Sequence, residues 1–151
     1  MTQEEFIKQL DKEDYSYEIE GDRIIVTYKG YVDLEDLTSL PPGVVFKNKG
    51  YVDLNDLTSL PSGVVFNNGE DVYLQSLTSL SPGVEFNNGG YVDLRSLTSI
   101  PPGVEFKNRG NIDLRSLVGG NGYFVEWAGN IEGIDPKRLL NVMIKQGVFE
   151  R

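Results

Sequence analysis

Tyr31-Val32-Asp33-Leu34 opens a unit of 20 residues that reads YVDLEDLTSLPPGVVFKNKG and ends at Gly50. The same pattern starts again at positions 51, 71, 91 and 111, each time 20 residues later and without an insertion. The fifth unit stops after Leu117, where Val118-Gly119 replaces the Thr-Ser pair of the other units. Regular self-similarity of this kind is the sequence signature of a repeat protein.

Each unit is predicted to hold two short strands. Val32 and Leu34 alternate with polar neighbours, which is the pattern of a strand that buries one face. Val44 and Phe46 alternate in the same way with Val45, a position that carries glutamate in two later units. A helix is not predicted, because no stripe of 3.6-residue period runs through the repeat.

Two turns are predicted to join these strands. Leu37 and Leu40 lead into Pro41-Pro42-Gly43, where proline fixes φ and glycine permits a positive φ. Residues 47–50 form the second turn, which holds an asparagine in every complete unit. We expect the asparagine column and the Thr-Ser columns to hydrogen-bond between neighbouring units. The asparagines are Asn48, Asn68, Asn88 and Asn108.

Two strands and two turns in 20 residues predict a mainly β fold, a parallel β-solenoid of about five coils. One coil is too small to bury its own apolar side chains, so the core must form by stacking. Neighbouring coils should lie about 4.8 Å apart, the spacing of adjacent strands. We expect one folded domain with three parts: an N-terminal cap (1–30), the repeat solenoid (31–118) and a C-terminal cap (119–151).

The caps are expected because an open solenoid end exposes unpaired strand edges. Thr2 is predicted to cap a helix that runs through Leu10, and strands at 15–19 and 23–28 should form a hairpin around residues 20–22. At the other end, residues 123–127 are predicted to form a strand. Asp135-Pro136 has the residues typical of a helix start, and that helix should cover the last coil.

Composition excludes several function classes. The chain has no cysteine and no histidine, so neither a Ser-His-Asp nor a Cys-His site can be built. A net charge of −9 argues against direct binding of nucleic acid. The sequence contains no apolar run long enough for a membrane span and no leader, so a cytoplasmic protein is expected. We expect no enzymatic activity, no cofactor and no bound metal.

The charge is unevenly distributed. Residues 1–30 carry eight acidic and four basic side chains, and the units at 31–90 are each net negative. From residue 91 onward Arg95 and Arg115 occupy positions held by Glu35 and Asn55 in earlier units. An acidic front half could steer a basic protein partner toward it, although such charge also keeps a protein soluble.

The segment Leu37-Thr38-Ser39-Leu40-Pro41-Pro42-Gly43, with the spaced Val-x-Phe and the recurrent asparagine, resembles bacterial leucine-rich-repeat proteins over residues 31 to about 117. That resemblance implies a protein-binding function. The predicted architecture, with 20 residues in each coil, is similar to that of pentapeptide-repeat proteins. The segment Val32-Asp33-Leu34-Glu35-Asp36 fits their five-residue unit. Some acidic members of that family resemble duplex DNA, which implies a DNA-mimic binder as an alternative. Small acidic repeat proteins of this appearance also occur in bacteria and their phages, where small proteins often block host enzymes. This resemblance implies a phage-encoded inhibitor of a bacterial defence or nucleic-acid-handling protein.

The outward positions of the first strand alternate between tyrosine and aspartate, and the third unit exchanges the two. Tyrosine is enriched in binding hot spots because it offers a large, rigid contact area. We therefore predict a non-enzymatic protein-binding module, either monomer or homodimer, possessing one partner-binding face. Strand preference alone would also place tyrosine here, in which case the chain is a structural spacer. The predicted partner-binding residues are Tyr31, Asp33, Tyr51, Asp53, Asp71, Tyr73, Tyr91 and Asp93.

Two alternatives concern the aspartates. Asp33 and Asp53 should stack about 5 Å apart, which is the carboxylate separation of a retaining glycosidase. A glycan-active enzyme is therefore a second function class, although a flat face offers no substrate pocket. The same column of carboxylates offers the oxygen ligands that calcium prefers.

Overall fold

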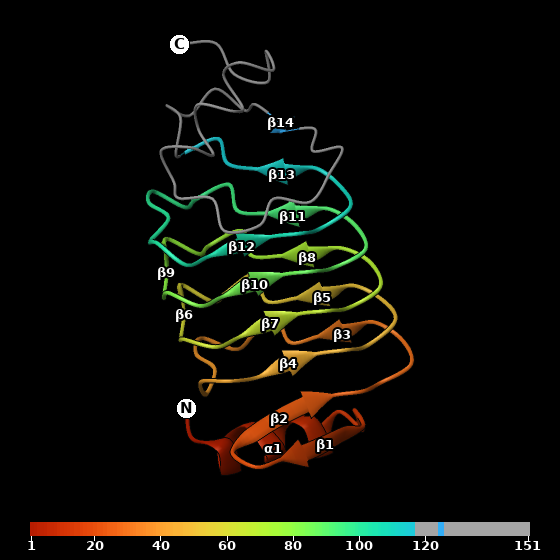
Figure 1. The fold of residues 1–151 in the computed structure, drawn as a ribbon. Helices are drawn as coiled ribbons and strands as arrows, with labels where there is room; N and C mark the ends of the chain where they lie inside the picture. Colours follow the sequence, from red (N-terminus) through yellow and green to blue (C-terminus); the bar gives the residue numbers. More distant parts are fainter. Residues whose placement is uncertain (117–123, 126–151) are drawn as a thin grey trace.

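The computed structural model describes residues 1–116 and 124–125. It is a mainly β protein whose repeats form a parallel β-solenoid, as the sequence predicts (Figure 1). Successive repeats lie one above the next, and the N-terminal helix and hairpin lie at one end of the stack.

Two six-stranded sheets form the long sides of the solenoid. Within the repeats all neighbours are parallel, and each strand residue pairs with its equivalent 20 positions later, as Val32 does with Val52. The repeat length therefore sets the register. One sheet contains β3 (Val32–Asp33), β5 (Val52–Asp53), β8 (Val72–Tyr73), β11 (Val92–Asp93), β13 (Ile112–Asp113) and β14 (Phe124–Val125). The other contains β1 (Tyr17–Glu20), β2 (Arg23–Val26), β4 (Val45–Phe46), β7 (Val65–Phe66), β10 (Glu85–Phe86) and β12 (Glu105–Phe106).

The core consists of apolar columns between the two sheets. Val32, Leu34, Leu37 and Val44 are buried, and so are their equivalents among the residues that the structure describes. The phenylalanine column is a stack of parallel rings, with centroids 5.2 to 5.3 Å apart. Because each side chain packs on its own equivalent, one repeat supplies the complementary surface for the next.

A third, two-stranded sheet occupies the corner before the proline turn. It pairs β6 (Ser59–Leu60) with β9 (Ser79–Leu80), where the sequence predicted only a corner. The backbone N–H of Ser81 donates to the carbonyl of Leu60 at 3.1 Å. The equivalent residues in the second and fourth repeats are Pro61 and Pro101, which lack this donor. Among the described residues the third sheet therefore forms only between the second and third repeats.

The asparagine column lies in the second turn, as expected, and the structure shows that its side chains are buried. The Asn68 side-chain nitrogen donates to the carbonyls of Gly50, Glu70 and Asp71 at 3.1, 3.3 and 3.0 Å. One of these carbonyls belongs to the preceding coil and two to its own turn. Thr78 likewise donates its hydroxyl to the carbonyl of Thr58, one coil away. The predicted side-chain hydrogen bonds between coils are confirmed for the asparagine and threonine columns, and for the serine column they stay a prediction.

The N-terminal segment contains the predicted helix and hairpin with slightly different bounds. Helix α1 (Gln3–Lys12) begins at a capping box formed by Thr2 and Glu5 and extends past Leu10. Strands β1 and β2 are antiparallel and join through a two-residue turn at Gly21, whose φ is +61°. Strand β2 then pairs with β4 in parallel, so the hairpin extends the sheet of the repeats.

Part of the C-terminal prediction is visible. Strand β14 falls inside the predicted strand 123–127 and runs antiparallel to β13. The predicted helix that begins at Asp135 lies outside the described residues. Across the part of the chain that is described, no helix has both the length and the apolar character needed to cross a bilayer.

Candidate functional site

The eight predicted partner-binding residues lie on the outer side of the sheet that contains β3, β5, β8 and β11. We call this surface the Tyr/Asp face. Its columns are in register: Asp33 pairs with Asp53, Asp53 with Tyr73, and Tyr73 with Asp93. Val32 and its equivalents, one residue away, point into the core, so the alternation of the strand holds the face outward.

Four tyrosine rings form a continuous row along this face, which we call the tyrosine row. Tyr31 stacks on Tyr51 with centroids 4.9 Å apart and an interplanar angle of 8°. Tyr51 then meets Tyr73 edge to face at 5.6 Å, and Tyr73 lies 6.4 Å from Tyr91. The exchange of residues in the third repeat therefore leaves the row unbroken, which the sequence did not reveal.

Asp71 occupies the position that tyrosine holds in the neighbouring repeats. Its carboxylate accepts a hydrogen bond from the Tyr73 hydroxyl at 2.8 Å and from the Tyr91 backbone N–H at 2.8 Å. Burial and this contact with Asp71 raise the pKa of Tyr73 to about 12. A Cβ at Gly90 would lie only 2.3 Å from the Asp71 carboxylate, so a side chain there would displace the carboxylate from its hydrogen bonds. Asp71 thus holds two tyrosines of the row in place.

The other aspartates each close a local turn. The carboxylate of Asp33 accepts from the backbone N–H of Glu35 at 3.1 Å, and Asp53 accepts from Asn55 at 3.0 Å. The third repeat has Tyr73 in this position. There the side chain of Asn55 accepts from the Gln75 N–H at 3.0 Å instead. These carboxylates therefore have a structural role in addition to any role in binding.

Asp93 was expected to be exposed to solvent, and the structure shows that it is buried. It lies in the predicted column, yet only 1% of it is exposed. Arg95 covers its carboxylate with a bidentate contact, Nε at 3.0 Å from one oxygen and Nη2 at 2.7 Å from the other. Asp113 is buried in the same way under Arg115. The bidentate fork of arginine matches a carboxylate, so the charge of these two aspartates is neutralised within the face.

The acidic half of the face has no such pairing. Glu35 and Asn55 stand where Arg95 and Arg115 stand later, and the described ion pairs of this sheet involve only Asp93 and Asp113. Neighbouring Asp33 and Asp53 raise the pKa of Glu35. Burial raises the pKa of Asp53, and Asp33 adds to the rise. Among the described residues, the negative charge of this half is therefore not neutralised by an ion pair within the sheet.

Asp33, Glu35 and Asp53 bring one carboxylate oxygen each within 4.8 Å of one another. The two aspartates belong to the column that the sequence analysis considered for calcium, because calcium prefers several oxygen ligands. Repulsion among these carboxylates accounts for the direction of the Glu35 shift without an ion. The cluster is therefore a group of mutually repelling acids, and its geometry alone does not define a metal site.

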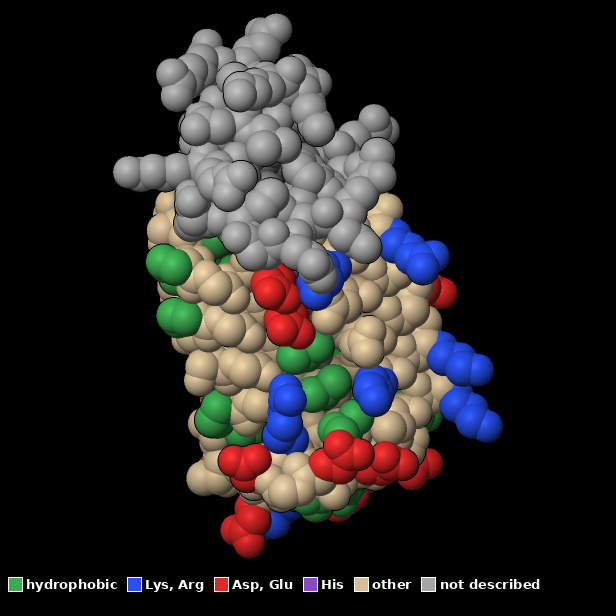
Figure 2. All heavy atoms as spheres, in the orientation of Figure 1, with side chains coloured by type: hydrophobic (Ala, Val, Ile, Leu, Met, Phe, Trp, Pro, Cys, Tyr) green, Lys and Arg blue, Asp and Glu red, His purple; other side chains and the backbone are tan. Residues whose placement is uncertain are grey.

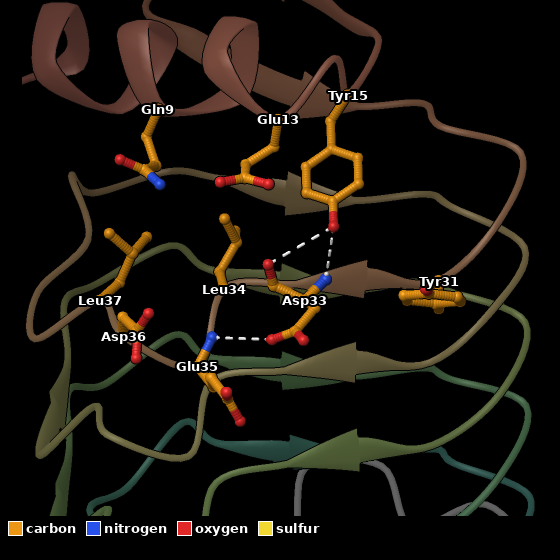
Figure 3. Close-up of a pocket in the computed structure, with 9 residues that line it drawn as sticks. All are labelled: Gln9, Glu13, Tyr15, Tyr31, Asp33, Leu34, Glu35, Asp36 and Leu37. Carbon is orange, nitrogen blue, oxygen red and sulfur yellow. Dashed lines mark hydrogen bonds between the residues drawn. The ribbon is translucent and has the colours of Figure 1, made fainter.

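A hollow of about 300 Å³ lies where the N-terminal segment meets the first repeat (Figure 3). It is lined on one side by Gln9, Glu13 and Tyr15, and on the other by the start of the Tyr/Asp face. The hydroxyl of Tyr15 accepts a hydrogen bond from the Asp33 N–H at 3.0 Å. The repeat pattern predicted the residues of the face but missed Glu13 and Tyr15, since neither belongs to a repeat.

Charge is distributed along the molecule as the sequence predicts. Acidic side chains gather around the N-terminal helix and hairpin at the foot of the molecule (Figure 2). In the Tyr/Asp face the acidic repeats adjoin this end, whereas Arg95 and Arg115 belong to later repeats. One end of the face is therefore acidic and aromatic, and the other is charge-balanced.

Comparison with known proteins was negative at three levels: no family model, no curated protein and no solved structure matches this chain. The fold and the face therefore carry the functional argument. They define a β-solenoid repeat protein with an aromatic and acidic outer sheet.

Proposed function

We propose that this chain is a non-enzymatic protein-binding module whose partner docks on the Tyr/Asp face. The observation that supports the proposal is the tyrosine row, four rings in contact across four repeats. Tyr31 at its end is 53% exposed. Tyrosine and arginine dominate binding hot spots because they combine apolar area with a polar tip.

Rigidity favours this use of the row. Each strand beneath it hydrogen-bonds to the next coil, as Val32 does to Tyr51 at 2.9 Å. Contacts between rings and the hydrogen bonds of Asp71 hold the tyrosines in place. A surface that is ordered before binding loses less conformational entropy when a partner docks.

The acidic half of the face favours a basic partner. Complementary charge speeds association and selects among partners. The resemblances in the sequence, together with the net charge of −9, support a sharper form of the proposal. In that form the partner is a bacterial defence or nucleic-acid-handling protein, and the chain is a phage-encoded inhibitor that acts in the cytoplasm. An acidic surface that occupies a DNA-binding site is one way in which such inhibition would work.

Affinity capture from a bacterial lysate tests the proposal when three versions of the chain are compared. Tyr51→Ala combined with Tyr91→Ala removes two rings from the row. Glu85→Ala combined with Glu105→Ala alters the outer side of the opposite sheet and is the matched control. We expect the parent and the control to retain one partner and the tyrosine variant to lose it by tenfold or more.

Three further measurements complete this test. Circular dichroism must show that all versions are folded, and sedimentation establishes whether the parent is a monomer or a homodimer. Addition of duplex DNA should release the partner if the face occupies a DNA-binding site. Retention of the partner by the tyrosine variant at the parent level would contradict docking on this face.

A further inference from the structure

The end of the tyrosine row forms one wall of a groove between the N-terminal segment and the first repeat. Besides the hollow in Figure 3, an adjoining pocket of about 270 Å³ is lined by Glu13, Tyr15, Tyr28, Gly30 and Tyr31. The two hollows share Glu13, Tyr15 and Tyr31. We call the combined space the Tyr31 groove.

Tyr31 presents one ring face to this groove. Its other face is covered by Tyr51, which stacks on it almost in parallel. Tyr51 belongs to the next repeat, so the uncovered face of Tyr31 points toward the N-terminal segment. Figure 3 draws the Tyr31 ring edge-on, with the Tyr15 ring between it and the helix. Tyr15 and Tyr28 meet edge to face at 4.9 Å and form a second aromatic wall.

The charge around the groove is entirely negative. Glu13, Asp33, Glu35 and Asp36 line it, and neither lining set of described residues includes a lysine or an arginine. Glu13 is also the C-cap of α1, so the negative end of the helix dipole lies beside the groove. The repulsion that Glu35 experiences from Asp33 would be relieved by a bound cation.

Aromatic faces and carboxylates together favour one kind of cation. A guanidinium group is planar, stacks on an aromatic ring and forms bidentate contacts with a carboxylate. An ammonium group is a compact and strongly hydrated charge that stacks less well. A metal ion would use the carboxylates but gain nothing from three tyrosine rings.

We propose that the Tyr31 groove binds an arginine side chain of the partner protein, with its guanidinium stacked on Tyr31 and paired with Glu13. This inference rests on the proposed function, since it names the chemistry that the partner must supply. It places the centre of recognition at the junction of the N-terminal segment with the first repeat. The remainder of the Tyr/Asp face then extends the contact.

Three short peptides and the full chain provide a direct test. Acetyl-Gly-Arg-Gly-amide carries the guanidinium group. Its citrulline analogue has nearly the same shape but no charge, and the lysine analogue has a positive charge but no planar group. Titration followed by amide NMR should show saturable shifts at Glu13, Tyr31 and Asp33 with the arginine peptide. We expect the citrulline peptide to cause none and the lysine peptide to bind severalfold more weakly.

Substitutions locate the site. Tyr31→Leu removes the stacking surface and should raise the dissociation constant about fivefold, given the strength of an exposed cation–π contact. Glu13→Gln should raise it by a smaller factor. The matched control is Glu70→Gln, which removes one exposed acid from the turn between the second and third repeats. It should leave the dissociation constant unchanged, and amide spectra confirm that each variant is folded.

Equal binding of the citrulline or lysine peptide would overturn the proposal, as would arginine-dependent shifts that survive Tyr31→Leu. The result is separable from the test of the proposed function. If the peptides fail while Tyr51→Ala with Tyr91→Ala still abolishes partner capture, the face binds a partner and the groove assignment is wrong. If the arginine peptide binds as expected while the tyrosine variant still captures the partner, the groove assignment stands and the wider face is wrong.

Discussion

The hydroxyl of Tyr15 replaces a missing strand at the backbone of Asp33. It accepts a hydrogen bond from the Asp33 N–H at 3.0 Å and lies 3.4 Å from the Asp33 carbonyl, to which it donates. In the next coil, the carbonyl of Asp53 accepts instead from the Leu34 N–H of the preceding coil. The first repeat has no preceding coil on this sheet. One side chain therefore satisfies both the N–H and the carbonyl of Asp33 at the edge of the strand.

Replacing Tyr15 with phenylalanine should lower the free energy of unfolding by about 1–2 kcal/mol, because it leaves a half-buried backbone N–H unpaired. The ring contact with Tyr28 is retained, so only the hydroxyl is tested. Chemical denaturation provides the measurement. Tyr51→Phe is the control, since no hydrogen bond joins its hydroxyl to another described residue. Equal loss in both variants would show that the edge contact contributes nothing.

Truncation in the middle of the stack should be much more destabilising. Phe86 packs between Phe66 and Phe106, and Leu74 is fully buried in the same core. We expect Phe86→Ala or Leu74→Ala to reduce the free energy of unfolding by about 2–5 kcal/mol. Ile19→Ala is the control, since that side chain is 59% exposed. A truncated core variant that melts at the parent temperature would contradict the inward assignment.

Substitution of Asn68 by aspartate should destabilise the fold in a pH-dependent way. The Asn68 nitrogen donates to three carbonyls. A buried carboxylate in its place would have no proton to donate, so its oxygens would lie against the carbonyl oxygens. We expect a loss of about 3 kcal/mol or more at neutral pH. Burial should raise the pKa of the introduced carboxyl in the folded state. The deficit should therefore be smallest below about pH 4 and grow as the pH rises through that folded-state pKa.

Unfolding curves between pH 3 and pH 8 would measure this dependence. Asn67→Asp, at an exposed neighbouring position, is the control and should show little change across the range. A flat pH profile for Asn68→Asp would show that the buried turn accommodates a carboxylate, in conflict with the geometry of the column.

Alkaline pH should weaken the fold through the tyrosine row. Burial, together with Asp71 for one ring and Asp93 for the other, raises the pKa of Tyr73 and of Tyr91 to about 12. In the unfolded chain a tyrosine loses its proton near pH 10. Between these values the unfolded state binds fewer protons, so stability is complete below about pH 10 and falls as the pH rises toward 12.

Ultraviolet titration of the phenolates should resolve late-titrating tyrosines in the folded protein, and unfolding curves should show the parallel loss of stability. Tyr73→Phe should remove part of the decline between pH 10 and pH 12, because its ring remains while its proton is absent. If the variant declined as steeply as the parent, Tyr73 would not be linked to folding in this range.

The sequence was sufficient for the fold because its repeat length is constant. A strand of alternating polarity must bury one face, and an unbroken 20-residue spacing allows Val32 to meet only its own equivalents. Column membership, the alignment of the asparagines in one turn and the outward position of Tyr31 and Asp33 follow from that spacing. The third sheet was less predictable, because it depends on whether residue 81 carries an N–H while residues 61 and 101 do not.

The sequence alone thus determined which residues share a column and which side of the sheet they occupy, since both depend only on local periodicity. The tertiary structure decided what each outward side chain does there. It buried Asp93 under Arg95, joined Tyr73 to the tyrosines of the other column, and brought Tyr15 and Glu13 against the first repeat. Those outcomes depend on side-chain conformation and on contacts between a non-repeating segment and the stack, which no periodic pattern encodes.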